Sequence, residues 1–358
     1  MSTPTSITSV TVEPLNLPLY EPFQIATGVF PAANNVIVRV TLASGAVGLG
    51  EASPSLPSGG ETQATVLAGA QAMAEVLPER DAASWRGLAQ WLRANFKAQE
   101  CARAATEMAL LDALTRHHGV PLYQWFGGTQ TRIETDLTIP IVAPERAREL
   151  ASAIAARGIR IIKVKVGGDL GDDEARVVAI HEAAPAATLQ LDGNQGFSVT
   201  SALRFLARLE ARGIIPTLFE QPLYRDDWLG MTDLTARAPV AICADESVHT
   251  AADAIRVVRE RAAHIINIKL MKSAFLASLD IVGVCHAARL DLMIGGMMES
   301  RLGSAAAAHF AAGIGGFVSI DLDTPMLIDG DPFTGGYAQT GGVYDLAGVT
   351  AGHGVAQR

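Results

Sequence analysis

Cysteine is scarce in this sequence, and the three that occur form neither disulfide pairs nor a metal-ligand spacing: Cys101, Cys243 and Cys285. This argues against a disulfide scaffold or zinc site and for a reducing compartment. The net charge is −9, so the positive surplus typical of nucleic-acid binding is missing. No uninterrupted apolar run is long enough to cross a bilayer, and the first residues lack the pattern of a signal peptide. We therefore expect a cytoplasmic protein with no nucleic-acid or membrane partner.

Apolar residues, in contrast, are plentiful, and their pattern changes along the chain. They make up 49% of 358 residues, enough for a large core and about two domains. Alternation over 6–15 and 35–42 predicts strands, and helical spacing over 62–77, 85–96 and 102–118 predicts a block of helices. We expect an α+β capping domain at 1–130, a barrel domain at 131–325 and a segment at 326–358 that returns to the capping domain.

From residue 136 onward, short β-branched runs alternate with helical patterns. One polar or glycine residue at or near the end of each run gives the positions 138, 165, 192, 220, 245, 269, 296 and 321. Successive positions differ by 27, 27, 28, 25, 24, 27 and 25 residues. Eight strands at a nearly constant step predict an α/β fold, a (β/α)8 or modified TIM barrel, whose active site lies at the carboxyl ends of the strands.

Three acidic residues close three consecutive predicted strands: Asp192, Glu220 and Asp245. A single acidic residue at a strand end is more often a helix cap. Three converging carboxylates repel one another unless they are paired or bind a metal. Oxygen ligands favour Mg²⁺ or Mn²⁺ over zinc, so this trio predicts a metal site.

Two lysine-containing strands flank that trio. Strand alternation puts Lys163 and Lys165 on one face of their strand, and Lys269 ends the strand after Asp245. Either strand alone could simply be half-exposed with solvated lysines. Barrel strands are buried on both sides, however, so an inward lysine needs a partner or a function. The positive charge of Lys163 could also help to leave Lys165 partly neutral as a base.

A divalent ion between two lysines suits proton abstraction beside a carboxylate. The ion stabilises the enediolate that forms when the weakly acidic α-proton leaves. Two bases on opposite faces of one carbon allow removal on one side and return on the other. That reaction is the inversion catalysed by a racemase or epimerase.

Five motifs together resemble the muconate-lactonising-enzyme subgroup of the enolase superfamily over essentially the whole chain. They are Lys163-Val164-Lys165, Asp192-Gly193-Asn194, Phe219-Glu220-Gln221-Pro222, Ala244-Asp245-Glu246-Ser247 and Asn267-Ile268-Lys269-Leu270-Met271-Lys272. The resemblance implies one Mg²⁺ per subunit on the three carboxylates, with Mn²⁺ as a substitute. It also implies that Lys165 and Lys269 are the acid/base catalysts, acting on the D and L epimer respectively.

The segment Asp321-Leu322-Asp323 narrows the resemblance to the dipeptide epimerases. A bare Asp-x-Asp before Thr324-Pro325 is more often a turn with a helix cap. In this subgroup it resembles the element that holds the substrate ammonium, opposite the metal that takes the carboxylate. The resemblance further implies substrate contacts from Thr138, Lys163, Gly296 and Met298. The expected partner is a small-molecule dipeptide, and the oligomeric state, including a homo-oligomer, stays open.

Three other functions remain open from the sequence. A cycloisomerase, N-acylamino-acid racemase or o-succinylbenzoate synthase would share the metal and lysines without needing both Asp321 and Asp323. A Schiff-base aldolase would not need three carboxylates, and a non-catalytic binding barrel would not need both lysines.

The two expected capping loops, at 22–30 and around 54–60, contain no Lys or Arg. Epimerases acting on Ala-Glu place a basic residue in the first loop, where Gly28 stands here, and no Lys or Arg precedes Arg39 or lies between it and Arg80. A buried carboxylate without a cation is disfavoured, whereas Phe23, Ile25, Val29 and Phe30 offer apolar surface. We therefore expect a preference for a neutral or hydrophobic second residue.

Overall fold

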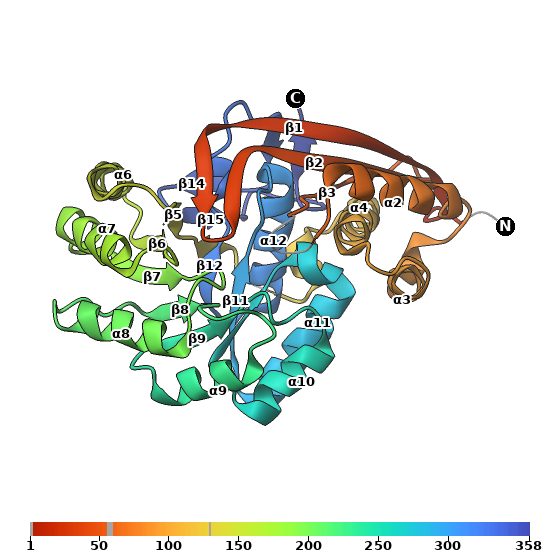
Figure 1. Ribbon diagram of the computed structural model, residues 1–358. Coiled ribbons are helices and arrows are strands. Elements are labelled where there is room, and N and C mark those ends of the chain that lie inside the picture. The colour runs from red at the N-terminus through yellow and green to blue at the C-terminus, as the bar shows by residue number, and fades with distance from the viewer. Residues whose placement is uncertain (1–2, 56–59, 129) are drawn as a thin grey trace.

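The computed structural model of the protein describes residues 3–55, 60–128 and 130–358, and it begins with an antiparallel sheet (Figure 1). The sheet has the order β1 (Ile7–Ile25), β2 (Gly28–Leu42) and β3 (Val47–Ala52). The long β1–β2 hairpin extends over one end of the barrel (Figure 1). The expected loop at 54–60 lies partly outside the described residues, because 56–59 are not described.

Five helical segments follow this sheet; three of them lie where helices were predicted, and two of these pack against the sheet. They are α2 (Gln63–Val76), η1 (Ala82–Ser84), α3 (Trp85–Asn95), α4 (Glu100–His118) and α5 (Leu122–Trp125). Thr62 caps α2 through a capping box with Thr65, and Asp81 caps η1 by accepting from the Ala83 N–H. Helix α4 is buried along nearly its whole length, because it lies between the sheet and α11.

Eight parallel strands form the barrel, which confirms the predicted fold class. In chain order they are β5 (Leu137–Ile139), β6 (Ile161–Lys165), β7 (Thr188–Asp192), β8 (Leu218–Glu220), β9 (Ala241–Ala244), β10 (Ile265–Ile268), β11 (Asp291–Gly295) and β12 (Phe317–Asp321). Each pairs with its neighbours in sequence. Hydrogen bonds from the N–H of Asp136 to Ile320 O and from the N–H of Leu322 to Thr135 Oγ1 join the last strand to the first.

Seven helices cover the outside of the barrel (Figure 1). They are α6 (Pro144–Ala156), α7 (Leu170–Ala183), α8 (Val199–Glu210), α9 (Trp228–Arg237), α10 (Ala251–Glu260), α11 (Leu270–Ala288) and α12 (Arg301–Ile314). The last strand is followed instead by the single 3-10 turn η2 (Thr324–Met326). An ideal (β/α)8 barrel has an eighth helix there, and residues 322–358, all described, contain no α-helix.

Helix α11 is the one described helix long and apolar enough to span a membrane by length and composition. Its most apolar stretch is 67% buried in the fold. It packs against α4, α10 and strands β10 and β11. A helix buried to this extent is typical of the core of a folded domain.

The C-terminal segment packs back against the first part of the chain. Strand β16 (Val355–Gln357) pairs with β13 (Phe333–Gly335), and β15 (Val343–Asp345) lies between β14 (Ala338–Thr340) and β4 (Arg132–Glu134). The His353 ring contacts Asp112 of α4 and Leu49 of β3. The C-terminal segment thus contacts α4 and β3, and the division into domains at 1–130, 131–325 and 326–358 stays a prediction.

The barrel interior is layered. One end contains a small apolar cluster of Leu218, Cys243, Ile265 and Met293. Polar side chains also lie inside the barrel, such as Ser319, which pairs with Met293 in the sheet register and whose hydroxyl donates to Gln190 Oε1. The charged residues occupy the end that the β1–β2 hairpin covers.

Candidate active site

The three acidic residues expected to bind a metal end three neighbouring strands. In the sheet register Asp192 pairs with Glu220, and Asp245 directly follows β9, which pairs with β8. Their exposed fractions are 0%, 0% and 2%. Carboxylates buried this deeply need compensating positive charge.

Lys163 provides part of that charge. Its Nζ lies 2.6 Å from Asp321 Oδ2, 2.7 Å from Glu220 Oε2 and 3.0 Å from Asp192 Oδ2. Burial alone would lower the pKa of Lys163, but the surrounding carboxylates hold it well above its usual value. The sequence predicts that the charge of Lys163 helps to keep Lys165 neutral, and the structure pairs that charge with carboxylates.

Three further lysines contact the same layer. Lys165 Nζ lies 2.6 Å from Asp192 Oδ2, and Lys269 Nζ lies 2.8 Å from Asp245 Oδ2. Lys272 Nζ lies 2.6 Å from Asp245 Oδ1 and donates also to the Asp245 carbonyl. Lys272 belongs to one of the five sequence motifs, which predicts no role for it.

The neighbouring lysines shift the pKa values of the three proposed metal ligands unequally. Burial acts to raise the pKa of Asp192 and Asp245, but their neighbouring lysines lower both below the ordinary value. Burial, followed by the charge of Asp192, raises the pKa of Glu220 to about 7. Burial and the charge of Asp245 raise the pKa of the adjacent Glu246 to about 8.

The composition of this layer fits a divalent cation. Seven buried carboxyl groups face four lysines: Asp136, Asp192, Glu220, Asp245, Glu246, Asp321 and Asp323 against Lys163, Lys165, Lys269 and Lys272. Glu246 Oε2 and Asn194 Oδ1 are buried without a hydrogen bond, whereas Glu220 Oε2 lies against the Lys163 ammonium. Oxygen ligands with a negative surplus are the environment that Mg²⁺ prefers.

Asp136 is a further buried acidic residue, for which the sequence motifs predict no role. Among the described residues, Asp136, Asp321 and Asp323 are the one group of three whose ligand atoms all lie within 4.8 Å of one another. Both carboxyl oxygens of Asp136 lack a hydrogen bond, and burial beside Asp321 raises its pKa well above the usual value. Asp136 lies two residues before Thr138, and this spacing, which puts both on the same strand face, could have indicated its place in the site.

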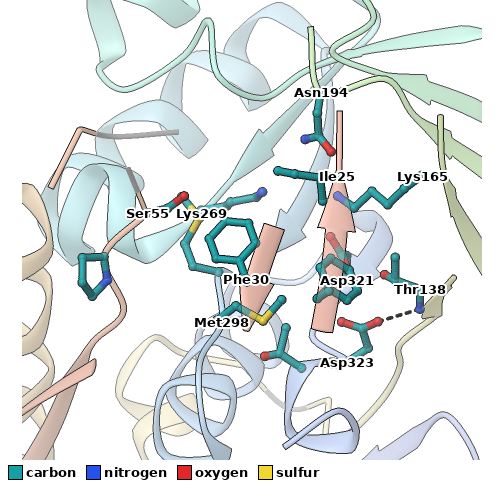
Figure 2. A pocket seen from close by; sticks show the side chains of 15 residues that line it. Ile25, Phe30, Ser55, Thr138, Lys165, Asn194, Lys269, Met298, Asp321 and Asp323 are labelled. Atoms are coloured by element: carbon teal, nitrogen blue, oxygen red, sulfur yellow. Dashed lines mark hydrogen bonds between the residues drawn. The ribbon is translucent and has the colours of Figure 1, made fainter. Parts of the chain in front are cut away.

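The Asp-x-Asp segment borders the cavity from the last strand. Asp321 ends β12, and Asp323 accepts a hydrogen bond of 2.6 Å from the backbone N–H of Thr138 (Figure 2). Asp323 precedes the turn η2 but makes no side-chain cap. Burial and the neighbouring Asp321 raise the pKa of Asp323 to about 6.

Lys165 and Lys269 reach the same cavity from different strands. Figure 2 shows their ammonium groups pointing toward one another across it. Burial acts to lower the pKa of Lys269, but Asp245 and Glu220 raise it well above the ordinary value. The arrangement offers a nitrogen acid or base on each side of a bound molecule.

Apolar side chains form another part of the cavity. They are Phe23, Ile25, Phe30, Pro54, Met297 and Met298. The hairpin that carries the first three is attached to the barrel side by a hydrogen bond from the Ile141 N–H to Gln24 O. Val29, expected to share this surface, is 56% exposed and does not line the cavity. Lys165 and Lys269 are the only cationic side chains among the described lining residues.

The structure brings most of the predicted residues to this cavity. Those lining it are Thr138, Lys165, Lys269, Gly296, Met298, Asp321 and Asp323. Asp192, Glu220 and Asp245 lie in the ion-paired layer beside it. Lys163, expected to touch the substrate, is fully buried within that layer and does not line the cavity.

Both parts of the chain match known protein families. Residues 7–127 match the mandelate racemase/muconate lactonizing enzyme N-terminal domain. Residues 145–357 match the family described as enolase C-terminal domain-like.

Individual relatives are similar over nearly their whole length. An aromatic dipeptide epimerase from Herpetosiphon aurantiacus is 49% identical, covering 98% of this chain and 99% of its own. An L-Ala-D/L-Glu epimerase from Bacillus subtilis is 34% identical, covering 93% and 92%. The structure also resembles a dipeptide epimerase from Cytophaga hutchinsonii complexed with Mg and D-Ala-L-Val, with a TM-score of 0.94, 35% identity and coverage of 99% and 96%.

Proposed function

We propose that this chain epimerises a dipeptide at the α-carbon of the C-terminal residue. The chain belongs to the mandelate racemase/muconate lactonizing enzyme family of the enolase superfamily. The observation that carries this proposal is the pair Lys165 and Lys269, which point toward one another across a single cavity. Such a pair can remove a proton from one face of a carbon and return one to the other. The dipeptide epimerases among its relatives support the choice of substrate class.

The metal in this proposal is one Mg²⁺ per subunit, with Mn²⁺ as a substitute. Asp192, Glu220 and Asp245 would hold it, because they end neighbouring strands beside the cavity and provide oxygen ligands. When bound, the ion supplies positive charge that stabilises the negative charge developing on the substrate carboxylate. The relative complexed with Mg and a dipeptide supports this choice of ion.

The lysines alternate between base and acid. A neutral lysine takes the α-proton, and the opposite lysine, present as the ammonium, delivers its own proton to the other face. By resemblance to the family, Lys165 acts on the D epimer and Lys269 on the L epimer.

The two ends of the dipeptide differ in charge, and so do the two sides of the cavity. Asp321 and Asp323 would accept hydrogen bonds from the substrate ammonium. Thr138 positions Asp323 through its backbone N–H, which fixes one carboxyl oxygen. Gly296 and Met298 would contact the backbone and side chain of the substrate.

The apolar lining favours a neutral or hydrophobic second residue. Phe23, Ile25 and Phe30 provide apolar surface, and the two cations that line the cavity are already assigned to proton transfer. A glutamate side chain there would lose its hydration without gaining a cationic partner. The aromatic dipeptide epimerase among the relatives supports this preference, and the Glu-specific relative provides the contrast.

A screen of L,L-dipeptides in D₂O with Mg²⁺ tests this function. The expected result is deuterium at the C-terminal α-carbon together with formation of the L,D epimer, measured by mass spectrometry and chiral chromatography. Activity on N-acylated amino acids but not on free dipeptides would instead indicate another enzyme of the family.

We also propose a cytoplasmic location for this enzyme, which its buried, unpaired cysteines support.

A further inference from the structure

A second cavity, with four lysine and arginine side chains among its ten lining residues, lies between the N-terminal helices and the barrel. It occupies about 210 Å³ beside α3, α4 and the start of α11, which pack together (Figure 1). Its charged or titratable lining residues are Arg93, Lys97, Glu100, Arg103, His249 and Lys272. None of its lining residues lines the active-site cavity. Glu100 is the one acidic residue among its described lining residues.

Arg103 is the buried member of this cluster. Its side chain is 8% exposed, and one terminal nitrogen lies 3.1 Å from Glu100 Oε1. Its Nε is buried without any acceptor. A buried, charged N–H without an acceptor is unfavourable, so the arrangement calls for an acceptor from a ligand. Glu61 and Glu107 also interact electrostatically with Arg103, but neither lines the cavity.

Arg93 and Lys97 supply positive charge at the solvent side. Both side chains are exposed, and neither forms an ion pair with a carboxylate within the described ranges 3–55, 60–128 and 130–358. Arg93 belongs to α3, whereas Lys97 lies in the turn before α4. Their charges therefore remain available to a bound anion.

The two other titratable basic groups are already engaged. Lys272 Nζ donates to Asp245 Oδ1, the Asp245 carbonyl and the Asn267 carbonyl, so its side chain closes the cavity without offering a free N–H. His249 interacts with the backbone of Glu246. The available donors are thus Arg93, Lys97 and Arg103 Nε.

We propose that this cavity is an anion site that binds a small tetrahedral oxyanion of the phosphate class. Arg103 Nε donates to one oxygen from the buried side, and Arg93 and Lys97 neutralise the charge from the solvent side. The volume admits one such ion with water, while the polar lining provides little apolar surface for a hydrophobic ligand. The proposal does not depend on the reaction at the other cavity.

Isothermal titration of the full-length protein with inorganic phosphate tests the site. We expect saturable binding in the millimolar range for the wild type, and roughly tenfold or greater weakening in the double variant Arg93→Gln, Lys97→Gln, since each loses a charged donor. The exposed residues of that variant leave the fold intact, which circular dichroism checks. Arg204→Gln with Arg208→Gln on α8 removes the same charge elsewhere and should leave phosphate affinity unchanged.

Two further arms separate this site from the active site and identify the source of the phosphate. Saturating L-Ala-L-Phe should not displace phosphate, because the two cavities share no residue. Tighter binding of glycerol 3-phosphate than of inorganic phosphate supports the site with an ester as its ligand. Absence of saturable binding, equal affinity in the Arg93→Gln, Lys97→Gln variant, or displacement by the dipeptide would each overturn the proposal.

Discussion

Lys163 Nζ lies 2.6 Å from Asp321 Oδ2 and joins the Asp-x-Asp segment of the last strand to the carboxylates of β7 and β8. One buried ammonium thus compensates three carboxylates from three strands. The proposed ammonium-binding and metal-binding groups are therefore electrostatically coupled before any substrate binds.

Replacing this ammonium should destabilise the fold. Lys163→Met leaves three buried carboxylates without their shared cation, so we expect the free energy of unfolding to fall by about 3 kcal/mol. Urea denaturation of the metal-free protein measures the change. Lys97→Met, at an exposed position, is the control and should change stability by less than about 0.5 kcal/mol. Equal stability of the two variants would contradict the described role of Lys163.

Removal of the metal should abolish activity. Treatment with EDTA is expected to eliminate epimerisation, and added Mg²⁺ should restore it, because the negative charge on the substrate carboxylate is otherwise uncompensated. Glu220→Gln should weaken Mg²⁺ binding by roughly tenfold or more while leaving the far-ultraviolet circular dichroism unchanged. Full activity of the metal-free enzyme would rule out the mechanism.

Glu107 gives a prediction for pH dependence. Burial raises its pKa from 4.5 to about 7, although the Leu276 N–H and Arg103 oppose the shift. The folded state therefore holds this proton more tightly than the unfolded state. The resulting stabilisation is present below about pH 4.5 and is lost as the pH rises through 7.

Glu107→Gln should consequently make the protein less sensitive to pH. Between pH 4.5 and pH 8, the free energy of unfolding of the variant should rise by up to about 3 kcal/mol relative to that of the wild type, since the variant has no proton to lose. Denaturant unfolding at a series of pH values measures the difference between the two proteins. A difference that does not change with pH would show that the Glu107 pKa is not raised.

Substrate preference should follow the apolar lining of the cavity. We expect kcat/KM for L-Ala-L-Phe, L-Ala-L-Leu and L-Ala-L-Met to exceed that for L-Ala-L-Glu. Gly28→Arg places a cation on the hairpin beside the apolar residues. It should raise the ratio of kcat/KM for L-Ala-L-Glu to kcat/KM for L-Ala-L-Phe by roughly tenfold. Gly28→Gln is the uncharged control. A wild-type enzyme that prefers L-Ala-L-Glu would contradict the assignment.

Much of the barrel could be predicted because its signals are local. Each strand is a β-branched run with a polar residue at or near its end, and parallel strands bring those ends together. This placed Asp192, Glu220 and Asp245 on neighbouring strands and turned Lys165 and Lys269 inward. The chain after Asp321 was less predictable, because an ideal barrel repeat implies a helix there, whereas Thr324 and Pro325 form one 3-10 turn.

Other features depend on contacts between distant parts of the chain. The sequence placed Lys163 on the inner face but could not show that Asp321, 158 residues away, would accept its hydrogen bond. For the same reason the sequence could not show that Lys163 would be buried outside the cavity lining. Val29 and Phe30 are consecutive residues of β2, so their side chains point to opposite faces and only Phe30 lines the cavity, which strand alternation alone could have shown.

The two-base assignment is tested most directly by α-proton exchange in D₂O with single-lysine variants. Lys165→Ala and Lys269→Ala should each abolish epimerisation of L-Ala-L-Phe, because each lacks one of the two proton carriers on opposite faces. Each variant should still exchange the α-proton of the one epimer that faces its remaining lysine: the L,L epimer in Lys165→Ala and the L,D epimer in Lys269→Ala. Epimerisation near the wild-type rate in either variant would contradict the account.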